Sequence, residues 1–139
     1  MNEGLICRLP AGQDLLNALT SEFKNRHIEK ASFSVIGAVT CATIGFYDLV
    51  KRQYDVKAFK GHYEIVQCSG NVSLKDGEIF VHAHIVLAGA DYQCFGGHLM
   101  SETRIFAAEL SALPLPGRAP ARQFDEQTGL YLWPMEQDA

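Results

Sequence analysis

Three histidines of this 139-residue chain are spaced so that they could bind one metal ion. His82 and His84 are separated by one residue, and because side chains alternate between the two faces of a strand, both imidazoles would project to the same side. The third histidine, His98, directly follows Gly96 and Gly97. Imidazole nitrogen is a ligand of zinc, copper, iron and nickel, so these residues raise the hypothesis of a transition-metal site.

A predicted hairpin brings His98 to the other two histidines. If the chain reverses direction through residues 90–92, His84 and His98 lie directly opposite each other on neighbouring strands and share a face of the sheet. A bulge of one residue would turn His98 to the other face, so the hypothesis depends on a regular register. Three histidine ligands leave a coordination position open, as in metal sites that bind or transform a small molecule, whereas a closed structural zinc site takes four protein ligands.

A second predicted hairpin places two polar residues opposite the histidines. The Asp-Gly pair at 76–77 favours a type I′ turn, because both central positions of that turn require positive φ angles. The register that follows sets Asn71 across from His82 and Ser69 across from His84, where the two side chains could hydrogen-bond to the imidazoles and orient them. A bulge at the glycine between Ser69 and Asn71 would break this register, and both residues could equally be ordinary polar residues of a turn or sheet end.

The elements that must position these residues are mostly strands, and the sequence predicts an α+β fold with a mainly antiparallel sheet. One long flanking helix is indicated by Leu15, Leu16, Leu19 and Phe23, which recur at helical spacing. Residues 114–122 are rich in Pro and Gly and predict an extended segment, after which residues 123–132 return to the sheet edge. β-branched and aromatic residues separated by glycine predict strands over residues 5–9, 33–36, 39–47, 54–59, 63–68 and 103–113, and a hairpin over residues 72–81.

Composition favours a single domain over residues 1–139, with residues 134–139 as a frayed tail. The chain is 47% hydrophobic and 20% charged, which is enough apolar material for a sizeable core. Its formal net charge is −4 and its Lys and Arg residues are scattered, which disfavours a nucleic-acid partner. No apolar stretch approaches the roughly 20 residues that span a membrane, and the N-terminus lacks the pattern of a signal peptide, so we expect a cytoplasmic protein.

The remaining cysteines and histidines are expected to be structural. Cys7, Cys41, Cys68 and Cys94 are widely spaced and form no C-x-x-C pair, which favours buried free thiols over disulfides. Alternation from His98 puts Cys94 on the predicted histidine face, so a thiolate role for Cys94 is the lesser alternative. His27 is expected at a helix end and His62 at an exposed position before a strand.

Several short strings of the sequence occur together in one known family. With them the chain resembles the PPC domain, the plant and prokaryote conserved domain of unknown function, and in particular its free-standing prokaryotic type. The resemblance spans nearly the whole chain, from Arg8-Leu-Pro10 to the pattern of Arg122, Asp125 and Gly129-Leu130. The strings are Ile36-Gly-Ala-Val39, Gly45-Phe-Tyr-Asp48, Gly61-His-Tyr-Glu-Ile-Val66, Ser69-Gly-Asn71, His82-Ala-His84, Gly96-Gly-His98 and, as a single residue, Glu109.

The resemblance implies a fold, an assembly and a candidate site. Family members have an antiparallel sheet with flanking helices and assemble as trimers, so it implies a homotrimer here. Prokaryotic members present a histidine cluster, suited to zinc, at the positions of His82, His84 and His98, and Glu109 and Arg122 also match recurrent positions. Plant members carry the domain beside AT-hooks for DNA binding, but Gly117-Arg-Ala-Pro120 is only a fragment of the Arg-Gly-Arg-Pro centre of an AT-hook.

Three functions follow as hypotheses, and the sequence does not decide whether the protein is an enzyme. In the first, zinc or another divalent transition metal is held by the three histidines and binds or transforms an unidentified small molecule. A metal lowers the pKa of bound water to about 7, and Glu109 is then the candidate base. The alternative is a non-enzymatic protein-interaction or regulatory module in which the metal is structural or absent. DNA binding is the least favoured because of the acidic charge.

Overall fold

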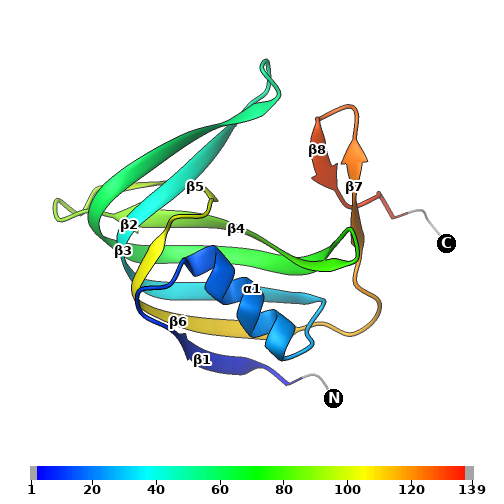
Figure 1. Cartoon of the computed structure of the whole chain (residues 1–139), viewed down its shortest axis with the longest axis horizontal. Helices are drawn as coiled ribbons and strands as arrows, with labels where there is room; N and C mark the ends of the chain where they lie inside the picture. Colours follow the sequence, from blue (N-terminus) through cyan, green and yellow to red (C-terminus); the bar gives the residue numbers. More distant parts are fainter. Residues whose placement is uncertain (1–2, 137–139) are drawn as a thin grey trace.

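The computed structural model describes residues 3–136, which form strands around a single helix (Figure 1). The elements in chain order are β1 (Leu5–Leu9), α1 (Leu15–Asn25), β2 (Ala31–Asp48), β3 (Gln53–Lys75), β4 (Glu78–Ala88), β5 (Cys94–Leu99), β6 (Arg104–Pro114), β7 (Ala121–Asp125) and β8 (Leu130–Leu132). The predicted combination of a mainly antiparallel sheet with one long helix is confirmed.

The main sheet curls and closes on itself. Its strand order is β1-β6-β2-β5-β4-β3-β7-β8, and β2 pairs with β3 as well, so that β2, β3, β4 and β5 form a closed circuit. Two residue pairs, Ile44 with Leu99 and Gly45 with His98, join β5 to β2 and complete this circuit. The pairings are antiparallel except for that of β3 with β7, which is parallel.

Two very long strands replace four of the shorter predicted ones, and the second of them also includes the first strand of the hairpin predicted at residues 72–81. β2 has 18 residues and β3 has 23, and register shifts within their pairing bend the strands between Val35 and Gly37, where the sequence suggested a break, and between Val39 and Cys41. Gly37 lies at one bend, and a Cβ atom there would come within 2.0 Å of the carbonyl oxygen of Ala107. Beyond the closed circuit the two strands continue as a two-stranded arm, residues 46–55, which projects from the body in Figure 1.

The helix covers the inner face of the sheet. Asp14 caps its N-terminus by accepting a hydrogen bond from the backbone N–H of Asn17, and Leu15, Leu19 and Phe23 are fully buried. Phe23 packs on Phe33 of β2 with ring centroids 5.6 Å apart. Burial of one such side chain contributes about 1.5–3 kcal/mol, so this apolar stripe anchors the helix to the sheet.

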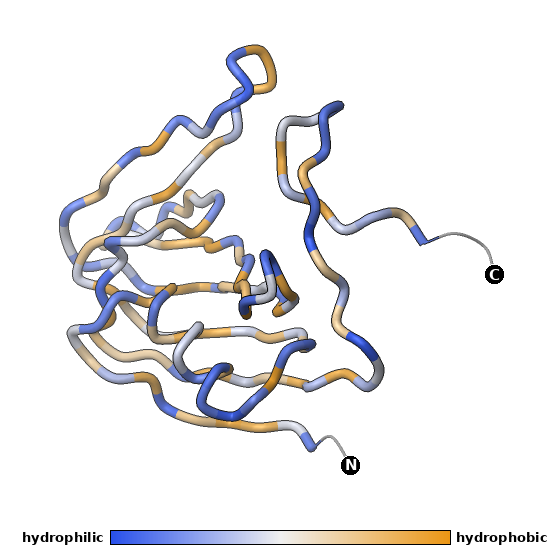
Figure 2. The backbone as a smooth tube through the Cα atoms, turned by 45° about the vertical axis from the view of Figure 1, so that its right-hand side comes forward, coloured by the Kyte–Doolittle hydropathy of each residue, from blue (hydrophilic) through white to orange (hydrophobic). Residues whose placement is uncertain are grey.

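The inner and outer faces of β4 alternate as the sequence predicts. Val81, Ala83, Ile85 and Leu87 are buried in the core cluster, and the side chains between them therefore project outward. Figure 2 shows hydrophobic residues concentrated in the body of the molecule, whereas the arm is largely polar apart from a hydrophobic stretch at its tip. No helix within residues 3–136 is long and apolar enough to cross a membrane.

The C-terminal segment returns to the edge of the sheet, as predicted. β7 pairs with β3 through Leu74 and Lys75, and β8 pairs with β7 to form a small hairpin that stands opposite the arm (Figure 1). Residues 134–136 of the predicted frayed tail have no regular structure, and residues 137–139 lie outside the described residues.

All four cysteines are free thiols, as predicted, but they are not all buried. Cys68 is completely buried, Cys7 and Cys41 are half-buried, and Cys94 is exposed. Cys94 begins β5, immediately after the loop at the end of the β4–β5 hairpin, so the expectation of burial was wrong for this residue. Burial raises the pKa of the Cys68 thiol to about 12.

We predict that Cys68 is unreactive until the protein unfolds. At about pH 8 a thiol of this pKa is present as the reactive thiolate in roughly one molecule in 10⁴. Alkylation with iodoacetamide, followed by peptide mass spectrometry, should label Cys68 at least about 100-fold more slowly in the native protein than in guanidinium chloride. Equal labelling rates in the two conditions would contradict the placement of Cys68 in the core.

Candidate metal centre

The hairpin of β4 and β5 brings the three histidines together in the predicted register. His84 lies directly opposite His98, and the loop between the strands closes with a hydrogen bond of 2.9 Å from the backbone N–H of Tyr92 to the carbonyl oxygen of Gly89. No bulge interrupts the pairs from Ala88 to His84. His98 therefore shares the outer face with His82 and His84.

The two glycines before His98 allow β5 to fit between its neighbours. A Cβ atom on Gly97 would lie 2.7 Å from a methyl carbon of Ile44 in β2. A Cβ atom on Gly96 would lie 2.2 Å from the carbonyl oxygen of Ile85 in β4. Both distances are shorter than any normal contact. A larger residue at Gly97 would therefore push β5 away from β2, and one at Gly96 would push it away from β4, which would move His98 away from the other histidines.

The spacing of the imidazoles suits a transition metal. One ligand atom from each of His82, His84 and His98 can be chosen so that all three lie within 4.8 Å of one another. The ring centroids are 5.2, 5.0 and 5.4 Å apart. Tetrahedral zinc with Zn–N distances near 2.0–2.1 Å separates its nitrogen ligands by about 3.4 Å, so small rotations of the rings would complete the ligand set.

The electrostatic state of the cluster also suits a metal. Burial lowers the pKa of His82 to about 4, with the charges of Arg122 and His84 adding to the effect. Burial likewise lowers the pKa of His98 to about 4, helped by the neighbouring histidines and Arg122. Both rings are therefore neutral at about pH 7, which is the form that coordinates a metal, and competition from protons begins at lower pH than for ordinary histidines.

The residues present thus fit a divalent transition metal held by three nitrogen ligands. His82 and His98 are half-buried and His84 is exposed. A metal bound there would supply a Lewis acid with a coordination position open to a small ligand.

The predicted register of Ser69 and Asn71 is confirmed, but their side chains hydrogen-bond to residues other than the histidines. Asn71 lies opposite His82 and Ser69 opposite His84, with Gly70 in regular pairing; the shift in this hairpin falls between Ile65 and Gln67. The amide oxygen of Asn71 accepts a hydrogen bond from Arg122, at 3.1 Å, and the Ser69 hydroxyl accepts one from Gln67, at 3.5 Å. That these residues orient the imidazoles stays a prediction.

The structure adds a tyrosine that sequence reasoning missed. Tyr54 of the arm places its hydroxyl oxygen 3.4 Å from Nδ1 of His98, with ring centroids 4.7 Å apart. Tyr54 pairs with Tyr47 across the arm, and that pairing could be inferred from the local turn. Its approach to His98 depends on the pairing of β2 with β5, for which the sequence carries no local signal.

Arg122 reaches the histidine cluster, whereas Glu109 lies apart from it. Arg122 sits in β7, beside Lys75 of β3, and its guanidinium lies against the rings of Phe80 and Trp133. Glu109 is exposed on β6, where it pairs with Arg8 on one side and Ile36 on the other. In the strand order β2 separates β6 from β5, so within one chain Glu109 belongs to a different part of the outer face.

A cavity of about 410 Å³ adjoins the cluster. This histidine cavity is bounded by the arm, the β7–β8 hairpin and the outer face of β3, β4 and β5, and His82, His98, Tyr54 and Arg122 are among its lining residues. The hairpin and the arm meet at its rim, where the Tyr47 hydroxyl donates a hydrogen bond of 2.6 Å to the carbonyl oxygen of Thr128.

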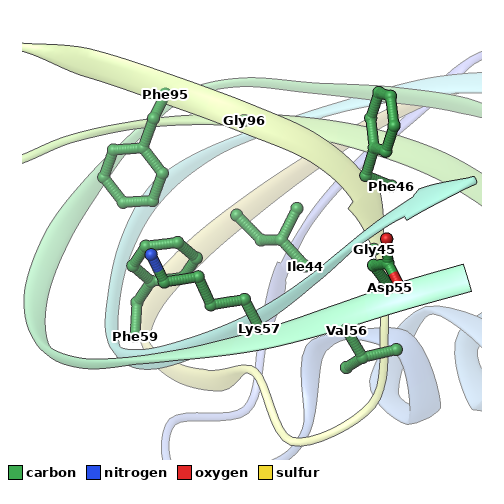
Figure 3. Close-up of a pocket in the computed structure, with 9 residues that line it drawn as sticks. All are labelled: Ile44, Gly45, Phe46, Asp55, Val56, Lys57, Phe59, Phe95 and Gly96. Atoms are coloured by element: carbon green, nitrogen blue, oxygen red, sulfur yellow. The ribbon is translucent and has the colours of Figure 1, made fainter. Parts of the chain in front are cut away.

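A second cavity, of about 490 Å³, is formed by the other face of the arm and by β5 (Figure 3). Ile44, Phe46, Phe59 and Phe95 make it mainly apolar, and Lys57 and Asp55 are its only ionisable residues within the described chain. It therefore offers no set of metal ligands. His27 and His62 also take no part in the cluster. His27 follows the helix, and Nε2 of His62 lies 4.0 Å from a carboxylate oxygen of Glu64.

Solved structures with this fold are known from archaea and bacteria. A metal-containing protein of Archaeoglobus fulgidus is 45% identical, with a TM-score of 0.90 over 96% of this chain and 94% of its own. A plant- and prokaryote-conserved protein of Pyrococcus horikoshii is 37% identical, with a TM-score of 0.92 over 97% and 93%. A protein of Ralstonia eutropha described as a candidate DNA-binding protein is 27% identical, with a TM-score of 0.84 over 94% and 90%. Among proteins with curated descriptions, none matches the chain significantly.

The family model of the Plants and Prokaryotes Conserved (PCC) domain matches residues 2–116, which include every strand of the histidine cluster. This is the family that the sequence motifs resemble under the abbreviation PPC. With the fold, the histidine register and the match over most of its length in agreement, the chain belongs to the Plants and Prokaryotes Conserved domain family.

Proposed function

We propose that this protein binds one divalent transition-metal ion, zinc by preference, through His82, His84 and His98, and uses it to bind or transform a small molecule. The observation that carries the proposal is the convergence of three imidazoles, two of which have a lowered pKa and line a cavity. The description of the relative from Archaeoglobus fulgidus as metal-containing supports it.

The division of labour among the residues follows from their positions. The three imidazoles would hold the metal. The Tyr54 hydroxyl can form a hydrogen bond either with His98 or with a ligand in the cavity. The sheet face opposite the histidines forms the core, so the histidines can be replaced without disturbing its packing. Glu109 would have to act from another copy of the chain to serve as a base.

The main alternative is a non-enzymatic interaction or regulatory module. The exposed apolar residues of the outer face are the observation that favours it, because such a face is typical of protein contacts. Removal of the metal with a chelator separates the two functions: loss of small-molecule binding without unfolding supports the first, whereas unchanged binding of a protein partner supports the second.

We predict that elemental analysis of protein purified without an affinity tag finds one metal ion per chain, and that His84→Ala abolishes it. Removal of a residue that only hydrogen-bonds to a metal ligand typically lowers metal affinity roughly 10–100-fold. Removal of a ligand itself should lower the affinity further. His84 is the exposed member of the cluster, so the variant should keep its fold by circular dichroism. His62→Ala, which removes an exposed histidine outside the cluster, is the matched control and should retain the metal. Equal metal content in the two variants would refute the site.

We propose a homotrimer, which is the assembly that the family resemblance implies, and the apolar residues on the outer face of the sheet support association with other copies of the chain. Ile6 of β1, Ile36 of β2 and Leu113 of β6 all project outward and are 83%, 55% and 51% exposed. Apolar residues gathered on one face favour burial against another copy, and closed cyclic symmetry covers such a face without leaving an open filament.

We predict that light scattering measures three times the chain mass of 15.4 kDa. Burial of the apolar outer face should keep this mass unchanged on dilution through the micromolar range. A monodisperse monomer over that range would exclude the trimer.

We predict that duplex DNA is not a specific partner, although two relatives are described as candidate DNA-binding proteins. Affinity for DNA comes largely from contacts of Lys and Arg with phosphates, and the formal net charge here is −4. Binding measured by fluorescence anisotropy should be lost at about 150 mM salt. Sequence-selective submicromolar binding at that salt concentration would overturn this prediction.

A further inference from the structure

The histidine cavity carries a charge opposite to that of the whole chain. Arg52, Lys75 and Arg122 line it, and no Asp or Glu does. Within residues 3–136, none of these three cations lies within ion-pair distance of a carboxylate. An acidic protein thus concentrates uncompensated positive charge beside its histidine cluster.

Arg122 is held in place without being neutralised. Its guanidinium carbon lies 5.2 Å from the ring centroid of Phe80 and 4.8 Å from that of Trp133. One terminal nitrogen donates to the carbonyl oxygen of Tyr131, at 3.2 Å, and the other to the side-chain oxygen of Asn71, at 3.1 Å. The buried Nε–H has no acceptor among the described residues. These contacts orient the guanidinium, and none of them supplies a negative charge.

The proposed metal would add to this excess of positive charge. Three neutral imidazoles leave a divalent ion with its full charge, whereas a carboxylate ligand would have reduced it. Arg122 shares the cavity with two of the three histidines, and its charge already contributes to the lowered pKa of each. Two cationic groups so close together favour an anion that interacts with both.

The walls of the cavity indicate what kind of anion fits. Tyr47 and Tyr54 of the arm are among its lining residues, as are Phe80 and Tyr131, whose rings both lie near Lys75. Lys75 lies 4.0 Å above the ring of Tyr131, so it projects along this aromatic wall. A volume of about 410 Å³ is at the small end of the range for small-molecule pockets. Aromatic walls favour a flat apolar body, and the cations favour a carboxylate at one end of it.

We propose that the histidine cavity binds a small organic carboxylate with a flat apolar body, whose negative charge compensates the bound metal and Arg122 and whose body lies against the aromatic side chains. This inference rests on the proposed metal site and names its class of ligand.

Calorimetric titration of the metal-loaded protein tests the ligand class with three probes. Benzoate supplies the carboxylate and the flat body, acetate the carboxylate alone, and benzamide the flat body without the charge. Benzoate should bind at least about tenfold more tightly than benzamide, because a hydrogen bond to a charged group is worth that factor or more. It should also change the fluorescence of Trp133, the single tryptophan of the chain, which lies against Arg122.

The role of Arg122 is tested with Arg122→Gln and with Arg118→Gln as the matched control, because Arg118 is exposed and does not line the cavity. Arg122→Gln should lower the affinity for benzoate at least about tenfold and leave the affinity for benzamide unchanged. It should hold the metal at least as tightly as the native protein, since a like charge has been removed. Arg118→Gln should behave as the native protein in every measurement.

The possible failures are distinguishable. A native protein without stoichiometric metal refutes the proposed function itself. A metal-loaded protein that binds neither benzoate nor acetate more tightly than benzamide refutes the carboxylate ligand while leaving the metal site intact. Loss of the metal in Arg122→Gln would refute the assignment of Arg122 to the anion, because its role would then be to maintain the cluster.

Discussion

The approach of β5 to both β4 and β2 is the contact on which the candidate site depends. This short strand completes the closed circuit of the sheet and carries His98, which pairs with His84 on one side and Gly45 on the other. Gly97 makes that approach possible, because a side chain there would collide with Ile44. The pairing of β5 with β4 assembles the histidine cluster, and its pairing with β2 closes the sheet, so both depend on this one strand.

The electrostatics of the site follow from where the closed sheet places it. Partial burial makes a charged imidazole unfavourable, so His82 and His98 are held in the neutral form that a metal requires. In the same surroundings the Arg122 guanidinium lies against two aromatic rings, and no carboxylate of the described residues is within ion-pair distance. A cavity lined by two of the three clustered histidines and by an unneutralised guanidinium would suit an anion, even though the chain as a whole is acidic.

The arm and the C-terminal hairpin turn an open cluster into a cavity. Tyr54 of the arm packs against His98. The β7–β8 hairpin contacts the arm at Gly129, where a Cβ atom would lie 2.8 Å from the Tyr47 hydroxyl. Neither element contributes a metal ligand. Their effect is to supply aromatic walls and cations, which decide what the cluster can bind rather than whether it forms.

The sequence by itself determined the local geometry of the site. Alternation along β4 set His82 and His84 outward, and the turn chemistry of Asp76-Gly77 set the register that places Asn71 opposite His82, because both effects act between neighbouring residues or across a tight turn. Only the tertiary structure decided that Tyr54 and Arg122 meet the cluster and that Glu109 does not. Those relations depend on the β2–β5 and β3–β7 pairings, in which segments far apart in the chain are joined by the closure of the sheet and not by any local preference.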